Sequence, residues 1–358
     1  MAVPKRVREF FQFILFTGLG VLILVLVYKS QNAAYMADCA LKGVPADQCS
    51  LMNKLKSDFA GVNYWWILVI VTAFILSNIL RAHRWLLLMQ TLGTKGRLSN
   101  AYFTIMVGYF ANMGLPRVGE VVRAGLFAKY ENIGPEKVMG TIVVDRILDL
   151  LSLLFAIILA IVLQGTVLMD FFSDKIGNSV FGQWWLYIVM ASGILGLILL
   201  YRFRRFIKQW NLYQRIHHLV EGFRDGLRSL RRVEHPMILL LDTVLIWILY
   251  YLMMFLCFKS FEPTTHLGGM AGLMVFVFGG LGVVFPSPGG MGTFHAMVIT
   301  ALAIYGIPGD DAFSFANIQY FSVQLLGCML MGIIGLIVLP IINHKARPNV
   351  DPADNSSV

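Results

Sequence analysis

The stretch that decides the fold is GYFANMGLPRVGEVVR, residues 108–123, which has apolar sequence on both sides. It contains glycines, a proline, two arginines and a glutamate. Glycine and proline interrupt helices, and a charged side chain at membrane depth is costly. An apolar chain that keeps such a stretch needs a structural or a functional reason for it.

The rest of the sequence is strongly apolar. Of its 358 residues, 58% are hydrophobic and 14% are charged, whereas soluble domains are roughly 45–50% apolar and about 25% charged. Apolar runs long enough to cross about 30 Å of hydrocarbon occur at 10–28, 63–80, 139–164, 184–201, 238–258 and 314–342. We therefore predict an all-α polytopic membrane protein, with about six to eight transmembrane helices and one or two re-entrant or broken helical hairpins. A single membrane domain is expected over 1–345, followed by a disordered tail at 346–358.

The first apolar run follows the basic residues Lys5, Arg6 and Arg8. It is longer than the apolar core of a signal peptide, about 7–15 residues, so we interpret it as a retained span; cleavage near NAAYMADCA is the alternative. Cys39 and Cys49 share the polar loop that follows. In an oxidising compartment they could form a disulfide, and two free thiols are the other reading.

Positive charge orients the spans, because Lys and Arg gather in cytoplasmic loops. The N-terminus, the loop 81–97 and the basic stretch 202–236 are therefore expected in the cytoplasm. The segments 166–183 and 307–311 contain more acidic than basic residues and are expected outside. The net charge of +9 comes from basic residues beside apolar segments, so we expect no nucleic-acid partner.

Parity explains the opening stretch. An odd number of crossings must separate the inside loop 81–97 from the outside segment 166–183, and the run 139–164 supplies one. The apolar stretch 98–116 is then expected to enter from the cytoplasm and return as a re-entrant hairpin. Non-helical backbone at membrane depth persists only where protein or a water-filled cavity satisfies its polar groups. Residues 108–123 should therefore form the return limb of this hairpin and its exit.

A second break lies in 268–306, where glycine is dense and PSPGG at 286–290 stops any helix. The neighbouring loops 259–267 and 307–311 both look external. Two arrangements remain open for this broken helix pair: two crossings with the break between them, or a second hairpin that enters from outside. Opposed broken helices of this kind occur in secondary transporters, which bind substrate between them.

Charged residues of the opening stretch are candidates for a ligand site. Arg117 follows Pro116, where its guanidinium can hold a phosphate through two hydrogen bonds. Glu120 and Arg123 are three residues apart and can pair on one helix face. One interpretation is a lipid headgroup site at the inner leaflet; the other is a membrane-exit anchor with a surface salt bridge.

Two carboxylates follow in VVDRILDLL. Asp145 and Asp149 are four residues apart and share one helix face, with Arg146 about 100° around the helix. Carboxylates inside a membrane are costly and indicate a functional site by default. They could bind a cationic headgroup or carry a proton; alternatively, they sit at the interface and pair with Arg146 or a neighbouring helix.

Five further residues are candidates for proton transfer or gating. Asp242 could join the same polar cavity or extend to the interface. His295 could titrate near neutral pH or be a hydrogen-bonded structural residue. Pro286, Gly289 and Gly290 form the second break.

The remaining motifs point away from catalysis. Arg81, Arg84 and Trp85 in RAHRW are interpreted as an interfacial anchor with an aromatic-belt residue. The sequence has no G-x-x-x-x-G-K-[ST], H-E-x-x-H or G-x-S-x-G motif. We therefore expect no ATPase, no enzymatic activity and no cofactor.

Four motifs occur in order along the chain: RAHRW; then Asn112, Pro116, Arg117, Gly119, Glu120 and Arg123; then Asp145, Arg146 and Asp149; then PSPGGMG. From about residue 10 to 342, the chain resembles the flippase-like family built on the transmembrane region of lysylphosphatidylglycerol synthetase. Each motif alone is weak, and the ordered set is fairly specific. We expect a stand-alone member of this family, without the soluble aminoacyl-transfer domain.

The resemblance implies a multi-pass protein of a prokaryotic cell (inner) membrane, and both termini are expected in the cytoplasm. It also implies movement of a lipid between leaflets; family members are linked to aminoacylated phospholipids, polyisoprenyl-phosphate-linked sugars and hopanoids. The implied substrate-binding residues are Asn112, Arg117, Glu120, Arg123, Asp145, Arg146 and Asp149. Many members have Glu at the place of Asp145, Glu near His295 and Arg near Gln319. Losing the last two, an acid and a base, together would keep the local charge balanced; it could equally mean a different headgroup or a weakened site.

We therefore expect a lipid translocase that moves a charged or phosphate-bearing lipid through a polar cavity between the two broken regions. The alternatives are a membrane-embedded lipid-modifying enzyme and an accessory subunit of an envelope glycolipid assembly system. The expected partner is a phospholipid, an aminoacylated lipid or a polyisoprenyl-phosphate lipid. A second copy of the chain and an envelope-synthesis enzyme are the further candidates.

Overall fold

The computed structural model describes residues 5–41, 49–114, 118–176, 233–285 and 287–344. These residues form helices and no strand. The helices are α1 (Lys5–Leu41), α2 (Leu51–Ala60), α3 (Tyr64–Gln90), α4 (Leu98–Gly114), α5 (Val118–Glu131), α6 (Pro135–Ile176), α10 (Pro236–Ser260), α11 (Gly269–Val284), α12 (Thr293–Ala303), α13 (Gly309–Tyr320) and α14 (Leu330–Ile342). Short 3₁₀ turns occur at η1 (Glu262–Thr264) and η2 (Pro288–Gly290), and a π-helix, η3 (Phe321–Met329), joins α13 to α14.

Four helical runs within the described residues are long and apolar enough to cross a membrane, by length and composition. They are α3, α6 as far as Phe171, α10, and the continuous run α13–η3–α14. These runs match the predicted spans 63–80, 139–164, 238–258 and 314–342. The predicted span 10–28 lies inside α1, whereas 184–201 and most of the basic stretch 202–236 lie outside the described residues. The prediction of an all-α polytopic membrane protein is confirmed.

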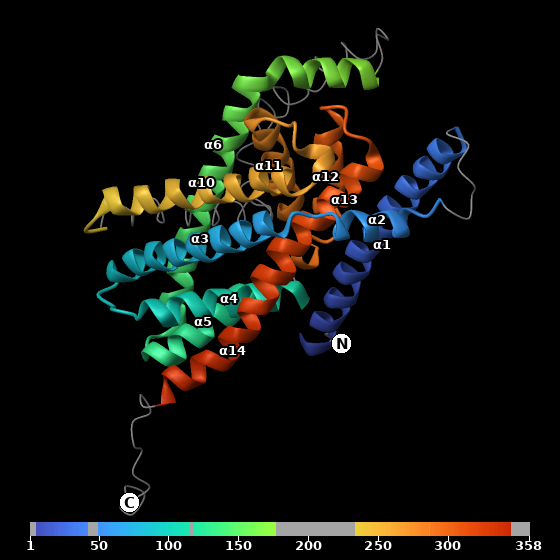
Figure 1. The fold of residues 1–358 in the computed structure, drawn as a ribbon. Helices are drawn as coiled ribbons and strands as arrows, with labels where there is room; N and C mark the ends of the chain where they lie inside the picture. The colour runs from blue at the N-terminus through green and yellow to red at the C-terminus, as the bar shows by residue number, and fades with distance from the viewer. Residues whose placement is uncertain (1–4, 42–48, 115–117, 177–232, 286, 345–358) are drawn as a thin grey trace, which may run out of the picture.

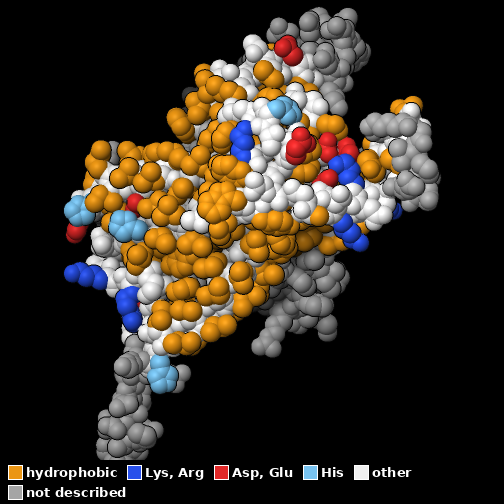
Figure 2. All heavy atoms as spheres, in the orientation of Figure 1, with side chains coloured by type: hydrophobic (Ala, Val, Ile, Leu, Met, Phe, Trp, Pro, Cys, Tyr) orange, Lys and Arg blue, Asp and Glu red, His pale blue; other side chains and the backbone are white. Residues whose placement is uncertain are grey.

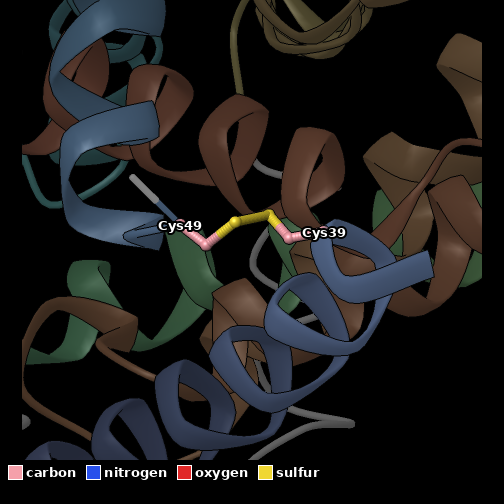
Figure 3. Close-up of a disulfide and its surroundings, with 2 residues drawn as sticks. All are labelled: Cys39 and Cys49. Atoms are coloured by element: carbon pink, nitrogen blue, oxygen red, sulfur yellow. A yellow bond between two sulfur atoms is a disulfide. The ribbon is translucent and has the colours of Figure 1, made fainter. Parts of the chain in front are cut away.

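The two N-terminal cysteines form a disulfide, which Figure 3 shows between α1 and the residue pair before α2. Cys39 belongs to the last turns of α1, because this helix continues to Leu41; its predicted place in a polar loop is therefore wrong. Cys49 directly precedes Ser50, whose hydroxyl accepts a hydrogen bond from the backbone N–H of Asn53 and caps α2. The disulfide thus fixes the end of α1 beside the start of α2.

One end of the molecule gathers segments that were predicted to lie outside. The backbone N–H of Asn63, before α3, donates to the carbonyl of Ser260, at the end of α10, at 2.9 Å. Lys54 on α2 donates to Asp311, in the first turn of α13, at 2.6 Å. Helices α3 and α10 therefore run antiparallel and lie side by side (Figure 1).

The opposite end gathers the start of α4, the end of α5 and the end of α14. The side-chain amide of Asn100 on α4 donates to Glu131 at 2.6 Å and to Asn343 at 3.1 Å. Both open ends of the α4–α5 pair therefore lie beside residues 91–97, and the two helices form a hairpin (Figure 1). The chain thus returns within 98–131, but the predicted limits are wrong: residues 98–114 form the first limb alone, and the return limb is α5. The entry of this hairpin into the membrane from the cytoplasm stays a prediction. The predicted loop 81–97 is wrong in its first ten residues, because α3 continues to Gln90.

Helices α11 and α12 form a second hairpin that contacts α6 at its open end. Gln164 of α6 donates to the carbonyl of Met270, near the start of α11, at 2.7 Å and accepts a hydrogen bond from the Tyr305 hydroxyl, just after α12. Helix α6 leaves helical geometry at this same Gln164, where φ is −135°. With 11 residues, α12 is about 17 Å long and too short to cross about 30 Å of hydrocarbon. This length favours the hairpin over the two crossings that the sequence left open.

Large aromatic side chains fill the space between the helices. Trp85, Phe127, Phe258 and Phe315 are all fully buried. Apolar side chains also remain on the outside, as on α6, where Val162 is 75% exposed. Figure 2 shows a broad hydrophobic area across one face, with charged side chains gathered to either side of it. A surface of this kind is suited to lipid.

Candidate functional site

The turn of the first hairpin is closed by Asn112, which belongs to the opening stretch of the sequence. Its side-chain oxygen accepts a hydrogen bond from the backbone N–H of Gly119 at 2.7 Å, in the first turn of α5. Glycine is required here because α4 and α5 approach closely: a Cβ at Gly108 would lie 2.8 Å from the carbonyl oxygen of Gly119. Asn112 and the two glycines therefore hold the hairpin together, whereas Arg117 lies outside the described residues.

The turn of the second hairpin depends on glycines in the left-handed region. Gly289, Gly290 and Gly292 have φ values of 57°, 75° and 80°, which other residues adopt only with strain. The carbonyl of Gly289 accepts a hydrogen bond from the side chain of Gln324 in η3 at 2.7 Å. A Cβ at Gly289 would lie 3.7 Å from the side chain of Met113, so the turns of the two hairpins meet. Pro286 lies outside the described residues.

A cavity of about 550 Å³ lies where the two turns meet, within the range of roughly 300–1,000 Å³ that is usual for ligand sites. Its polar lining includes Tyr109, Asn112, Glu120, Arg146, Gln319 and Gln324. The apolar lining comes from α3, α10, α11, α12 and η3. At its rim, Val283, Val284 and Phe285 of the second hairpin are 50%, 59% and 57% exposed. The cavity therefore joins a polar end to an apolar, exposed rim.

The π-helix η3 forms part of this cavity. Val323, Gln324 and Cys328 of η3 line it, together with Gln319 one turn earlier in α13. A π-helical segment inside a longer helix is rare and occurs often at functional sites. Nothing in the sequence pattern predicted it.

Behind the cavity lies a buried ion-pair network, which we define as Arg81, Arg84, Arg123, Asp145 and Asp149. Arg84 of α3 donates to Asp145 at 2.5 Å and to Asp149 at 2.7 Å. Arg81, also on α3, donates to both carboxylates, and Arg123 of α5 reaches Asp145 at 3.3 Å. The network therefore joins α3, α5 and α6 through side chains that share one face of α6, as the four-residue spacing predicted.

The three arginines of the network outnumber its two carboxylates. All three are buried, with exposed fractions of 2% for Arg81, 0% for Arg84 and 3% for Arg123. The guanidinium of Arg123 also lies over the Trp85 ring, 3.7 Å from its centre, in a cation–π contact. Several guanidinium nitrogens of these arginines, Arg123 Nη2 among them, have no hydrogen-bond partner among the described residues. The network thus has one spare positive charge and unused donors.

Glu120 and Arg146 form a separate ion pair at the cavity, which we call the cavity pair. Arg146 Nε lies 2.8 Å from a Glu120 oxygen, and the two side chains are 39% and 35% exposed. Arg146 Nη1 lies 3.7 Å from Asp149, which connects the cavity pair to the network. Tyr250 provides a second connection, since it lines the cavity and accepts a hydrogen bond from Arg81 at 3.0 Å.

Two sequence interpretations of these charges are wrong. Glu120 and Arg123 do not pair with each other; they point to different partners, because α6 packs against α5 and offers Arg146 to one and Asp145 to the other. Arg81, Arg84 and Trp85 are not an interfacial anchor, since all three are buried. Two arginines three residues apart in an apolar helix were a signal of an intramembrane site, and the Asp145–Asp149 pair was the matching set of carboxylates.

Two of the weaker candidates lie away from the cavity lining. Asp242 is near the start of α10, and its carboxylate lies 2.7 Å from Nδ1 of His83 on α3. His295 is 2% exposed and packs against the Tyr320 ring, with 4.9 Å between ring centres. Neither residue lines the cavity. In the described part of the chain, no three His, Cys, Asp or Glu side chains lie close enough to hold a metal ion.

Apolar spanning helices, two opposed hairpins and a cavity with a charged end define an integral membrane protein with an internal cavity. The chain belongs to the family described as the lysylphosphatidylglycerol synthase TM region, whose model matches residues 50–332. The sequence-based identification of this family is confirmed.

Two curated relatives are archaeal. A UPF0104 membrane protein of Methanocaldococcus jannaschii is 21% identical over 327 residues, which cover 82% of this chain and 90% of the relative. A UPF0104 membrane protein of Methanothermobacter thermautotrophicus is 23% identical over 290 residues, covering 74% of this chain and 82% of the relative. No solved structure matches the chain.

Proposed function

We propose that this protein moves a phosphate-bearing membrane lipid from one leaflet to the other, without an ATPase of its own. The observation that carries the proposal is the cavity between the turns of the two hairpins, with the cavity pair at its polar end. Membership of a family named after a lipid-synthase membrane region supports a lipid as the ligand. The polar end would take the headgroup while the tails stay in the bilayer.

The rim of the cavity supports this division of the lipid. Val283, Val284 and Phe285 are exposed and apolar, so they offer acyl chains a path out of the cavity without exposing them to charge. A soluble polar ligand would gain nothing from this rim, and burying its charge beside apolar surface would be costly. The shape of the lining therefore fits an amphiphile.

The buried ion-pair network is proposed to position the cavity pair and to supply positive potential. Asp145 and Asp149 are each held by buried arginines of α3, and neither lines the cavity. We therefore assign them a positioning role in place of direct headgroup binding or proton transfer. The spare positive charge behind the cavity favours an anionic group at its polar end.

The same arrangement argues against the enzyme alternative. A general acid or base must reach the substrate within about 2.6–3.2 Å, directly or through one water. The network carboxylates lie behind the lining, and Glu120 is already paired with Arg146. We therefore propose a carrier of intact lipid, and no observation favours an accessory subunit over it.

We also propose that the disulfide end of the molecule faces the outside of the cell membrane, so that both termini are cytoplasmic. Disulfides persist in oxidising compartments, and the Cys39–Cys49 bridge lies at the end predicted to be external. In intact cells, a membrane-impermeant maleimide should label the protein only after an impermeant reductant is added. The triple variant C39S/C49S/C328S should stay unlabelled, because Cys328 lines the cavity and is removed, and Cys257 is buried. Labelling that requires opened membranes would contradict this orientation.

The translocase proposal is tested with purified protein in liposomes that contain a trace of phosphatidylglycerol labelled on its acyl chain. An impermeant quencher should remove more label than the outer leaflet holds, and more than it removes from protein-free liposomes. V283W places a large ring at the rim of the cavity, where the acyl chains would leave it, and should slow this movement by about 10-fold or more. V162W places the same side chain on an exposed part of α6 and should leave the rate unchanged. Equal rates for wild-type and protein-free liposomes would sink the proposal.

A further inference from the structure

The lining of the cavity indicates which kind of headgroup it takes. Apart from the cavity pair, its described polar lining is uncharged and consists of amide and hydroxyl side chains: Asn112, Ser287, Gln319, Gln324, Tyr109 and Tyr250. Amides and hydroxyls recognise hydrogen-bonding groups by position, and they do not neutralise a charge. Most of a headgroup that fits this lining is therefore uncharged.

Gln319 provides the sharpest constraint. Its side chain lines the cavity and is 4% exposed, and its oxygen Oε1 has no hydrogen-bond partner among the described residues. A buried acceptor without a partner costs stability, so a donor that reaches Gln319 from the cavity would be stabilising. The amide oxygen requires a donor, which a hydroxyl group of a ligand would supply.

Arg146 provides the second constraint. Among the residues that the structure describes, Arg146 is the positively charged side chain that lines the cavity. Its guanidinium contacts Glu120 at 2.8 Å and Asp149 at 3.7 Å. Behind it, Arg81, Arg84 and Arg123 face two carboxylates. An anion beside Arg146 would offset the spare positive charge, and a phosphate would also fit the fork of a guanidinium.

The same charges disfavour a cationic headgroup. The carboxylate of the cavity lining, Glu120, is already matched by Arg146, and the network behind it is positive. An ammonium group would therefore meet a positive potential with no spare carboxylate to pair with. Aminoacylated lipids carry such a group.

We propose that the cavity binds a phospholipid whose headgroup carries uncharged hydroxyl groups, with its phosphate at Arg146 and a hydroxyl donating to Gln319. Phosphatidylglycerol has this chemistry, as would a phospholipid that carries a sugar. The inference rests on the proposed function, because it assigns the headgroup of the lipid that the cavity moves. It excludes the aminoacylated lipids from the substrates that the family resemblance left open.

The test measures lipid binding by native mass spectrometry of the purified full-length chain, with competing lipids of equal acyl composition. The lipids are phosphatidylglycerol, phosphatidylmethanol (which has the phosphate and no free hydroxyl), lysyl-phosphatidylglycerol and diacylglycerol. We expect phosphatidylglycerol to bind about 5-fold more tightly than phosphatidylmethanol, the equivalent of one hydrogen bond. Diacylglycerol should bind at least about 10-fold more weakly than either, because it lacks the phosphate.

Two variants assign these preferences to residues. Q319L should remove the preference for phosphatidylglycerol over phosphatidylmethanol and leave phosphatidylmethanol binding unchanged. R146Q should weaken the binding of both lipids by about 10-fold. Q90L changes a glutamine at the exposed end of α3 and should alter neither. A melting temperature recorded for each variant separates loss of binding from loss of folding.

The wild-type result alone can overturn the inference. Binding of lysyl-phosphatidylglycerol that equals or exceeds binding of phosphatidylglycerol would show that the site takes a cation. Equal binding of phosphatidylmethanol and phosphatidylglycerol would show that a headgroup hydroxyl does not contribute to binding. If the lipids bind in the expected order but none moves in liposomes, the proposed function is contradicted and the headgroup site is supported. If lipid moves but the binding order is the opposite, the proposed function is supported and the headgroup site is contradicted.

Discussion

The buried ion-pair network and the cavity pair are adjacent and are connected by the Arg146–Asp149 contact, yet they differ in almost every physical respect. Arg84 and Asp145 of the network are fully buried, whereas Glu120 and Arg146 of the cavity pair are 35% and 39% exposed. The network joins three helices through several hydrogen bonds, and the cavity pair joins α5 to α6 through one contact.

This difference separates a structural role from a functional one. Removing one partner of a buried ion pair leaves an uncompensated charge in a region of low dielectric constant, which is strongly destabilising. A half-exposed pair is screened and contributes little to stability, so its partners can separate to admit a ligand. We therefore expect variants of the network to lose the fold, and variants of the cavity pair to keep the fold and to change lipid binding.

The largest effect is expected from R84M. It leaves Asp145 and Asp149 buried with fewer partners, and should lower stability by about 3–5 kcal/mol. Thermal melting followed by size-exclusion chromatography would measure it, and the double variant R84M/D145N should recover part of the loss. The control on the same helix is Q90L, because Gln90 is exposed at the end of α3. Similar melting of R84M and Q90L would contradict the structural role of the network.

The next effect is expected from G119A, which should disturb both regions because α5 carries Glu120 and Arg123. A Cβ at this position would collide with the carbonyl oxygen of Gly108 and with Asn112. Overpacking of this kind costs about 1–3 kcal/mol, and lipid movement should fall with it. G125A lies on the same helix, where a Cβ meets nothing within 4 Å, and should be neutral or slightly stabilising. A shared melting temperature for the two variants would mean that the hairpin is not closely packed at Gly119.

A smaller stability effect is expected for E120Q. The cavity pair is half-exposed, so its loss should change stability by less than about 1 kcal/mol. The effect on lipid binding should be larger than the effect on stability. Phosphatidylglycerol should bind more tightly, because Arg146 would lose its closest carboxylate and become available to the phosphate. Thermal melting and phosphatidylglycerol binding measured on the same sample would separate the two effects. A decrease in melting temperature comparable to that of R84M would show that the cavity pair, like the network, has a structural role.

The smallest effect is expected from D242N. Its carboxylate contacts His83 and does not line the cavity, and an asparagine can still accept a hydrogen bond from the imidazole. Stability should change by less than about 1 kcal/mol, and lipid movement in liposomes should match that of the wild type. If D242N melts normally but moves lipid much more slowly than the wild type, the prediction that Asp242 is a gating residue would be supported.

Part of this arrangement was predictable from sequence because it is encoded locally. Apolar length identified the spans 63–80, 139–164, 238–258 and 314–342, and helix periodicity placed Asp145 and Asp149 on one face. Charge parity predicted a re-entrant hairpin at 98–116 with its return limb in 108–123. Helices α4 and α5 do form a hairpin, but α4 alone occupies Leu98–Gly114 and the return limb is Val118–Glu131.

The partners of the charges were not predictable, because they depend on which helices pack together. The sequence predicted an interfacial anchor at Arg81 and Arg84, whereas in the fold both arginines are paired with carboxylates of α6. Glu120 and Arg123 satisfied a rule for neighbours on one helix, but contacts with a second helix determined their pairing. The π-helix η3 follows from packing along the cavity and leaves no periodic signal in the sequence.

The most direct test of the central claim is the rate of phosphatidylglycerol movement by R146Q and wild-type protein, reconstituted in parallel, with the melting temperature of each recorded. Arg146 lines the cavity and belongs to the half-exposed pair, so its loss should leave the fold intact. We predict movement by the wild type above that of protein-free liposomes, a decrease of about 10-fold in R146Q, and melting temperatures within a few degrees of each other. Movement by R146Q at the wild-type rate would contradict the account.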